Sequence, residues 1–221
     1  MTTSERKAPV VAIGDVHGCA TLLRETIWPH LGSGAELIFL GDLIDRSPEP
    51  DGDQQVIELV RELQANPEVY GLAGVTVLRG NHEQMLLDAL AEEEPDHATD
   101  LWQWNGGNAG FLPVAREHQA WLESLPLTAQ RGEYLFVHAG VRPGVPLRQQ
   151  RAEDLLWIRG PFLNRDHGLP YTVVHGHTFQ RNYRVAQLPH RIGIDTGAFV
   201  SGRLTALPID PWAEHKLEVA A

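Results

Sequence analysis

Short apolar runs alternate with polar clusters along this chain, and six of the runs end directly on such a cluster. Apolar runs of this length are typical of buried strands. The runs are Val10–Ile13, Leu37–Leu40, Val75–Leu78, Tyr134–Val137, Thr172–Val174 and Ile192–Ile194. The clusters that follow them are rich in Asp, His, Asn and Arg. Because ligands gather beyond the carboxyl ends of strands in open α/β sheets, we expect these polar side chains to form one site.

Helical periodicity follows each of the first three runs. The apolar positions of the three expected helices are Leu22, Leu23, Ile27 and Leu31, then Val56, Ile57, Leu59, Val60 and Leu63, then Met85, Leu86, Leu87 and Leu90. The third helix is expected to end in solvent at residues 91–94. Residues 100–125 predict helices and loops, and a strand-rich half is expected from Leu127. This order predicts an α/β fold in which two sheets pack together with helices outside.

Composition narrows the class of protein. The chain has 221 residues, of which 43% are hydrophobic and 21% charged, so we expect one domain over residues 1–221. Its net charge of −11 argues against binding nucleic acid, which needs a basic surface. No apolar stretch reaches the length of a signal peptide or a membrane span, so we expect a cytoplasmic protein. The one cysteine, Cys19, excludes an internal disulfide and is expected to be a buried packing residue.

The polar clusters contain the side chains that a metal site needs. Asp15 and His17 are separated by one residue, so in extended backbone they point to the same side. Asp42 follows the next strand and has two carboxylate oxygens that could bridge two cations. The neutral ligands for a second cation are Asn81, His138 and His177. Oxygen and nitrogen ligands without sulfur suit Mn²⁺, Fe or Zn²⁺. Two such ions would activate a bridging hydroxide and neutralise the oxygens of a phosphate.

Further polar residues suit the hydrolysis of a phosphate ester. Arg46 and Arg159 could bind the phosphoryl oxygens, as bidentate guanidinium groups do. His82 directly follows Asn81 and could protonate the leaving oxygen. Asp45 would then hold the His82 imidazole in its cationic form.

These motifs resemble those of a known family. The sequences Gly14-Asp15-Val16-His17-Gly18, Gly41-Asp42-Leu43-Ile44-Asp45-Arg46 and Arg79-Gly80-Asn81-His82-Glu83 are similar to the three defining motifs of the phosphoprotein phosphatases within the calcineurin-like metallophosphoesterases, in their bacterial and phage branch. The same branch shows Asn105-Gly106-Gly107, Trp157-Ile158-Arg159, Gly176-His177-Thr178 and Ile194-Asp195-Thr196-Gly197. The resemblance extends from about Val10 to Leu207. One departure is Ser47, which stands where the family usually has Gly, and we expect only a local change of the loop.

The resemblance implies a fold, a ligand set and an activity. The fold is two packed mixed β-sheets flanked by helices, an αββα sandwich. Asp15, His17 and Asp42 would bind one metal, and Asp42, Asn81, His138 and His177 the other. His82 with Asp45 would be the acid pair, and Arg46, Arg159 and Asn81 would contact the phosphate. Two divalent ions are implied, with Mn²⁺ expected first and Fe or Zn²⁺ accepted.

Several residues near the motifs have alternative interpretations. His175 lies two residues before the expected ligand His177 and is interpreted as a packing residue or a partner of a ligand. Asp195 is expected to tie a loop by hydrogen bonds. Asn105 could touch phosphate or only form its turn. Trp102 and Trp104 could stack on a substrate, although we favour packing. The remaining histidines fit no ligand spacing and are expected at the surface: His30, His97, His118, His167, His190 and His215.

The predicted activity is that of a metal-dependent serine/threonine protein phosphatase that could also accept phosphotyrosine. Its partners would be a phosphorylated protein or a small phosphoester, and a monomer is the default. The main alternative is a symmetrical diadenosine tetraphosphatase. Those enzymes commonly lack the acid that precedes the arginine of the second motif, and Asp45 is present here. A non-catalytic metal-binding scaffold is a distant alternative, because no expected ligand or acid is missing.

Overall fold

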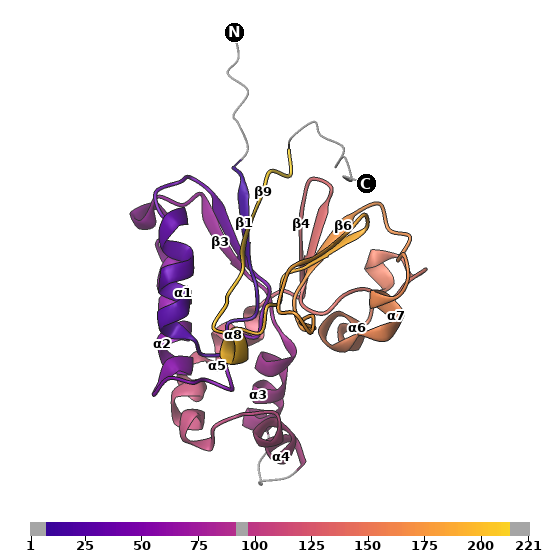
Figure 1. Cartoon of the computed structure of the whole chain (residues 1–221). Coiled ribbons are helices and arrows are strands. Elements are labelled where there is room, and N and C mark those ends of the chain that lie inside the picture. The colour runs from indigo at the N-terminus through magenta and orange to yellow at the C-terminus, as the bar shows by residue number, and fades with distance from the viewer. Residues whose placement is uncertain (1–7, 92–96, 213–221) are drawn as a thin grey trace.

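Two mixed β-sheets pack face to face, and helices cover the outer face of each sheet (Figure 1). This computed structural model describes residues 8–91 and 97–212. The sandwich confirms the fold expected from the sequence. The nine strands of the described residues are β1 (Val10–Ile13), β2 (Glu36–Phe39), β3 (Gly74–Val77), β4 (Thr128–Arg131), β5 (Tyr134–Val137), β6 (Thr172–His175), β7 (Ala186–Leu188), β8 (Arg191–Gly193) and β9 (Ala206–Ile209).

The strand order brings the carboxyl ends of six strands toward one region. The first sheet has the order β3-β2-β1-β9, in which β1, β2 and β3 run parallel and β9 pairs antiparallel with β1. The second sheet has the order β4-β5-β6-β8-β7, in which β5, β6 and β8 run parallel. These six parallel strands are the six apolar runs of the sequence. Both the first and the last residue of each strand lie within one residue of the predicted bounds.

Alternation along the strands divides the core into layers. In β1, Val10 and Ala12 pack between the two sheets, whereas Val11 and Ile13 pack under the helices of the first sheet. In β5, Phe136 faces the other sheet, while its neighbours pack against the outer helices of the second sheet. Successive side chains of a strand point to opposite faces, so strands covered on both faces are apolar throughout. This double burial explains why the six runs are continuous rather than alternating.

Eight α-helices and four short 3₁₀ helices lie within the described residues. The α-helices are α1 (Ala20–Ile27), α2 (Gly52–Ala65), α3 (Asn81–Ala91), α4 (His97–Trp104), α5 (Leu112–Ser124), α6 (Ala152–Trp157), α7 (Gly160–Leu163) and α8 (Ala198–Ser201), and the 3₁₀ helices are η1 (Trp28–His30), η2 (Pro67–Tyr70), η3 (Ala109–Phe111) and η4 (Leu147–Gln149). α1 and α2 cover the first sheet, and α6 and α7 lie beside the second (Figure 1). The three helices that periodicity predicts are therefore present. Residues 92–94 lie outside the described residues.

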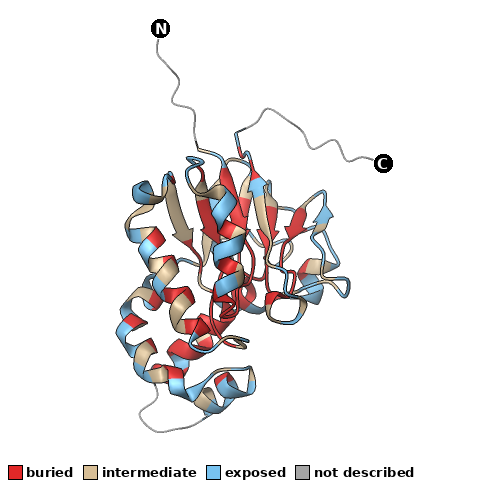
Figure 2. Ribbon diagram, turned by 60° about the vertical axis from the view of Figure 1, so that its left-hand side comes forward, coloured by how far each residue is buried: buried red, intermediate tan, exposed pale blue. Residues whose placement is uncertain are grey.

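Burial concentrates where the strands lead into the loops below them (Figure 2). Three expectations about single residues are wrong. His118 and His167 are buried rather than at the surface, because His118 packs beside Arg61 and His167 stacks on Phe162. Trp104 is 90% exposed and is therefore not a packing residue. His215 lies outside the described residues. Within those residues, no helix has the length and apolar character that crossing a membrane requires.

Candidate functional site

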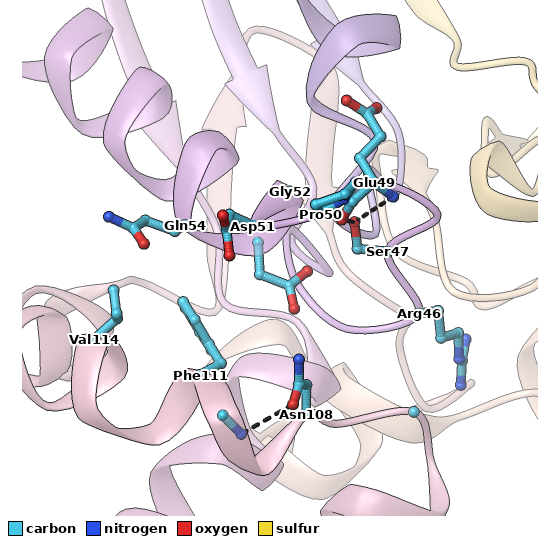
Figure 3. A pocket seen from close by; sticks show the side chains of 13 residues that line it. Arg46, Ser47, Glu49, Pro50, Asp51, Gly52, Gln54, Asn108, Phe111 and Val114 are labelled. Carbon is cyan, nitrogen blue, oxygen red and sulfur yellow. Dashed lines mark hydrogen bonds between the residues drawn. The ribbon is translucent and has the colours of Figure 1, made fainter.

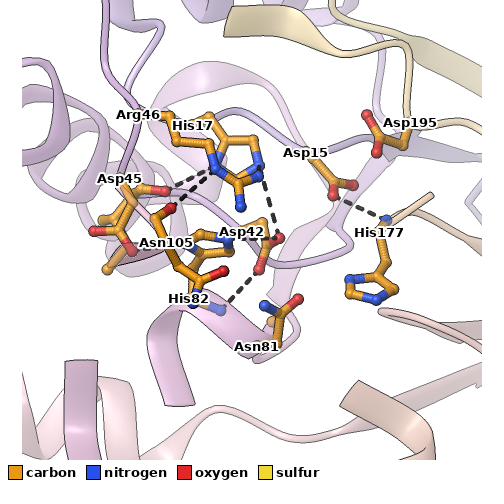
Figure 4. Close-up of polar contacts among 12 residues, drawn as sticks. Asp15, His17, Asp42, Asp45, Arg46, Asn81, His82, Asn105, His177 and Asp195 are labelled. Carbon is orange, nitrogen blue, oxygen red and sulfur yellow. Dashed lines mark hydrogen bonds and ion pairs between the residues drawn. The ribbon is translucent and has the colours of Figure 1, made fainter. Parts of the chain in front are cut away.

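The carboxyl ends of the parallel strands bring together the polar residues that the motifs single out (Figure 4). Asp15 and His17 follow β1, Asp42 follows β2, and Asn81 begins α3. His138 follows β5, and His177 follows β6. All six side chains are buried. The loops after five different strand ends thus contribute to one buried polar cluster.

In the first half of the cluster, His17 and Asp42 lie together with His82, and each offers a ligand atom within 4.8 Å of the others. His17 Nδ1 donates a hydrogen bond to the Ile44 carbonyl at 3.0 Å, so its other nitrogen, Nε2, carries the lone pair. That nitrogen lies 3.7 Å from Asp42 Oδ2. Burial lowers the pKa of His17 well below its usual range, which keeps the imidazole neutral. A neutral imidazole beside a carboxylate is a suitable pair of ligands for a divalent cation.

The second half of the cluster shows the same arrangement. His138 Nδ1 donates to the Leu40 carbonyl at 2.9 Å, and burial lowers the pKa of His138 to about 4. Its unprotonated Nε2 lies 2.8 Å from Asn81 Oδ1 and 3.3 Å from Asp42 Oδ1. Asp42, His138 and His177 each offer a ligand atom within 4.8 Å of the others. A carboxylate and neutral imidazole nitrogens that converge in this way fit a cation at their centre.

Asp15 supplies the clearest sign that the cluster suits a cation. Its Oδ2 accepts a hydrogen bond from the His177 backbone N–H at 2.9 Å. Its Oδ1 is buried and has no hydrogen-bond partner among the described residues. Burial raises the pKa of Asp15 well above its usual range, and the nearby Asp195 and Asp42 raise it further. Buried carboxylates that repel one another are stabilised by a bound cation, so the residues present fit a metal centre.

A second polar unit lies beside the cluster. His82 Nδ1 lies 2.6 Å from Asp45 Oδ2, and the Trp102 indole N–H donates to both oxygens of Asp45 at 2.9 Å. Burial raises the pKa of Asp45 to about 8, against the opposing effects of Trp102 and Arg46. Burial also lowers the pKa of His82. The contact with Asp45 fixes the imidazole at Nδ1, and its other nitrogen, Nε2, lies 4.0 Å from Asp42 Oδ2.

Glu83 is a site residue to which the sequence analysis assigns no role. This fully buried carboxylate accepts hydrogen bonds from the backbone N–H groups of Asp42, Leu43 and Gly80 at 2.7 to 2.9 Å. It therefore ties the loop after β2 to the loop after β3. The signal was present in the sequence, because Glu83 directly follows His82 in the third motif.

The backbone of the site adopts conformations that side chains rarely take. Five residues with predicted roles have positive φ angles, namely His17 (48°), Asp42 (51°), Asp45 (69°), Arg46 (60°) and His177 (62°). Such conformations cost of the order of 1 kcal/mol for residues other than glycine. These conformations persist because hydrogen bonds such as those accepted by Glu83 hold the loops. The same conformations turn the five side chains toward the cluster.

The two arginines lie at the edges of the cluster. Arg46 Nε donates to the Asn105 carbonyl at 3.0 Å, and its Nη1 lies 3.3 Å from His17 Nε2. Arg159 is exposed, and its Nε donates to His177 Nε2 at 3.0 Å. The Asn105 side chain donates to the Leu101 carbonyl, so Asn105 both forms its turn and holds Arg46. Both guanidinium groups therefore reach the cluster from opposite halves of the chain.

Other residues in or near the motifs lie around the cluster and form contacts that hold its loops. His175 is buried and bonds with Arg191, and Asp195 accepts from the Gly197 backbone N–H. Both arrangements match the expectation that they support the loops. Cys19 is buried, and burial raises the pKa of its thiol to about 11, so it is protonated and unreactive at neutral pH. The hydroxyl of Ser47 lies 2.9 Å from the carbonyls of both Gly18 and Glu49, so its proton can bond with either of them.

The fold and the donor set together define a metal-dependent phosphoesterase. Residues 8–194 match the calcineurin-like phosphoesterase family, and the chain belongs to that family. It is similar to serine/threonine-protein phosphatase 1 of Salmonella typhimurium, with 32% identity over 89% of each chain. This relative confirms the relationship to the phosphoprotein phosphatases.

Two further comparisons concern a second enzyme and the fold. A symmetrical bis(5'-nucleosyl)-tetraphosphatase of Aromatoleum aromaticum is 35% identical over 65% of this chain and 48% of its own length. The structure of a serine/threonine phosphatase from Saccharomyces cerevisiae superposes with a TM-score of 0.59 at 18% identity, covering 87% of this chain and 68% of the other. The structural likeness supports the fold alone.

Proposed function

We propose that this protein is a dinuclear metal-dependent protein phosphatase that hydrolyses phosphoserine and phosphothreonine esters. Asp15, His17 and Asp42 would hold one divalent ion, and Asp42, Asn81, His138 and His177 would hold the other. When bound, the ions would supply positive charge for the phosphate and lower the pKa of an attacking water. Mn²⁺ is expected first, and the oxygen and imidazole nitrogen donors also suit Fe or Zn²⁺.

The observation that carries this proposal is the acid pair next to the ligand cluster. His82 Nδ1 is fixed by Asp45 at 2.6 Å, so the proton on Nε2 faces the cluster, where a leaving oxygen would lie. An alkoxide is a poor leaving group, and a positioned acid accelerates its departure. Seryl and threonyl phosphates have such leaving groups, so an acid held by a buried carboxylate supports this class of substrate.

The arginines would bind the phosphoryl group from two sides. Arg46 is held by the Asn105 carbonyl, so its guanidinium is oriented before substrate arrives. Arg159 lies beside His177 and would turn toward the phosphate when His177 Nε2 binds an ion. Guanidinium groups bind phosphate oxygens with paired hydrogen bonds. Asn81, whose Oδ1 lies 2.8 Å from His138 Nε2, directly precedes His82, and its amide nitrogen would contact the same oxygens. The pocket then binds a dianionic phosphate although the chain as a whole is acidic.

Hydrolysis of a phosphoserine peptide tests the proposal. Dialysis against a chelator should abolish hydrolysis, and addition of Mn²⁺ should restore it. Asp42→Asn should reduce kcat at least about a hundredfold, because this residue contributes to both halves of the cluster. Full activity of Asp42→Asn, or of the chelated protein, would exclude the proposed centre.

The alternative substrate is a dinucleoside polyphosphate, which the similarity to the tetraphosphatase of Aromatoleum aromaticum favours. The leaving group of a dinucleoside polyphosphate is itself a phosphate, which needs no strong acid. The tetraphosphatase is also matched over only 48% of its own length. Turnover of a phosphopeptide and of diadenosine tetraphosphate, compared on the same preparation, separates the two activities. A kcat/KM for the dinucleotide at least tenfold above that for every peptide would replace the proposed substrate.

A further inference from the structure

A pocket of about 510 Å³ opens beside Arg46 (Figure 3). One wall is the loop between β2 and α2 with the first turn of α2, residues 46–54. The other wall consists of residues 106–114, which include η3 and the start of α5. Arg46 lines the pocket and also contacts His17 in the ligand cluster. A substrate whose phosphate binds Arg46 therefore has this pocket next to it.

The two walls differ in chemistry. The first wall carries the carboxylates of Asp51 and Asp53, together with Glu49, whose carboxylate accepts hydrogen bonds from the Thr21 backbone N–H and hydroxyl. The second wall carries the apolar side chains of Phe111 and Val114. Figure 3 shows Phe111 and Val114 across from Asp51 and Gln54. Arg46 is the single cation among the described residues that line the pocket. Its guanidinium donates to the Asn105 carbonyl and lies beside His17, and no ion pair joins it to a carboxylate of this wall among the described residues. Burial raises the pKa of the Asp53 carboxyl to about 7.

Asp53 is the most informative of these carboxylates. Its side chain is only 7% exposed, and its Oδ1 accepts a hydrogen bond from the Asp45 backbone N–H at 2.9 Å. No hydrogen bond or ion pair of its Oδ2 occurs within residues 8–91 and 97–212. This oxygen is not among the buried side-chain atoms that lack a partner in the described residues, so it reaches solvent and is open to an N–H donor brought into the pocket.

We propose that this pocket binds a lysine or arginine side chain that flanks the phosphorylated residue of the substrate. The alkyl stem would pack against Phe111 and Val114, and the cationic end would lie beside Asp51 and Asp53. Long basic side chains bury their stems on apolar surface while their charge stays in a polar environment. The proposal rests on the protein phosphatase function proposed above and names its substrate class, a phosphopeptide with a nearby basic residue.

The charge of the pocket also distinguishes this substrate from a dinucleotide. The polyphosphate chain of a dinucleotide would carry negative charge toward the carboxylates of the first wall, and like charges disfavour binding. A basic peptide is attracted both by the pocket and by the whole chain, whose net charge is −11. The pocket therefore selects for cationic neighbours of the phosphate.

The experiment compares phosphoserine peptides that differ at one position. Within each pair, one peptide carries lysine and the other carries glutamine at the same position, which lies one or two residues before or after the phosphoserine. For at least one position, the lysine peptide should have a kcat/KM about threefold to tenfold above its glutamine partner. The ratio should fall toward one as ionic strength rises, since partly exposed charges are screened.

Two variants assign the preference to the pocket. Asp51→Asn removes one carboxylate, and asparagine tolerates the positive φ of 55° at this position. Gln54→Lys places a cation on the same wall. Both should reduce the lysine-to-glutamine ratio by about half or more, and the ratio cancels any general loss of activity. Glu68→Gln is the matched control. It also removes one charge, but from η2, which precedes β3 at the opposite end of the sheet. Its lysine-to-glutamine ratio should equal that of the wild type.

The outcomes separate this proposal from the proposed function. If the wild type hydrolyses the peptides with equal kcat/KM, or if Asp51→Asn and Gln54→Lys keep the full lysine preference, the pocket does not bind the basic residue. If no phosphopeptide is hydrolysed while an aryl phosphate or a dinucleotide is, the protein phosphatase function itself is wrong.

Discussion

The indole nitrogen of Trp102 lies 2.9 Å from both carboxylate oxygens of Asp45 and donates its proton to them. Trp102 is fully buried, and it approaches from α4, far along the chain from the second motif. Asp45 in turn fixes His82. The chain of contacts from Trp102 through Asp45 to His82 sets the orientation of the proposed general acid.

Trp102→Phe should lower kcat for a phosphoserine peptide by about tenfold or more. Phenylalanine fills most of the space but donates no hydrogen bond, so the Asp45 carboxylate loses a partner that favours its ionised form. The acidic and basic limbs of the kcat pH profile should shift, which a purely structural role would not cause. Trp104→Phe is the control, since Trp104 is 90% exposed. Equal pH profiles for wild type and Trp102→Phe would contradict this positioning role.

His82→Gln should have an effect that depends on the leaving group. A general acid typically contributes 10²–10⁴-fold to the rate when the leaving oxygen is strongly basic. We therefore expect a loss of at least about a hundredfold on phosphoserine peptides and a much smaller loss on an aryl phosphate with an acidic phenol. The measurement is a plot of log kcat against leaving-group pKa for both proteins. Parallel plots would show that His82 does not protonate the leaving oxygen.

The local sequence was sufficient to predict the strands and most of the ligand cluster. Each apolar run is short, covered on both faces and followed directly by its polar residues, so strand and site appear in the same few residues, as at Val10–His17. The role of Trp102 could not be predicted in this way. Nothing near Trp102 in the sequence distinguishes its buried N–H donor from the exposed Trp104 two residues later, because the difference lies in how α4 packs on α3.

The buried histidines show a second limit. His167 was expected at the surface, yet it is 1% exposed, stacks on Phe162 and bonds with the His190 carbonyl. Phe162 is five residues away in the sequence, whereas His190 is 23 residues away and comes close when β8 pairs with β6. Periodicity identifies apolar faces, but it does not show which polar residue a tertiary contact will bury.

Gly176→Ala should weaken the first metal site. A Cβ at Gly176 would collide with Asp15 Oδ1, the buried oxygen that has no hydrogen-bond partner among the described residues. The carboxylate would have to move from its place beside the cluster, so we expect Mn²⁺ affinity to fall by about tenfold or more. Calorimetric titration of the metal-free protein with Mn²⁺ measures this directly. Gly160→Ala is the control, because the nearest atom to its added Cβ is 3.8 Å away, and it should bind Mn²⁺ as the wild type does.

Glu83→Gln should destabilise the fold as well as the site. The carboxylate accepts three backbone hydrogen bonds in a fully buried position, and a neutral amide cannot accept all of them. Loss of such bonds typically costs about 2–4 kcal/mol of unfolding free energy. Urea unfolding of the metal-free protein gives the value. Glu68→Gln, at an exposed position, should change it by less than about 0.5 kcal/mol.

His118 should make the fold less stable in mild acid. Burial lowers the pKa of His118 below its ordinary value of 6.5, and the adjacent Arg61 lowers it further, although Glu58 and Glu117 act in the opposite direction. Below about pH 6.5 the unfolded chain therefore binds a proton at this histidine that the folded chain does not bind. Acid then favours the unfolded state, and the penalty grows as pH falls from about 6.5 toward the folded pKa. Above that range the histidine is neutral in both states and contributes no pH dependence.

The variant His118→Gln isolates this effect, because glutamine can still bond with Arg61 but does not titrate. We expect the unfolding free energy of the wild type to decline more steeply than that of the variant between pH 7 and pH 5. The two curves should run parallel above pH 7, where neither state of the wild type protonates the ring. Other buried histidines, such as His175, whose pKa burial lowers to about 3, titrate in both proteins and cancel in the difference. A difference that stayed constant from pH 7 to pH 5 would show that His118 is protonated as readily in the folded chain as in the unfolded one.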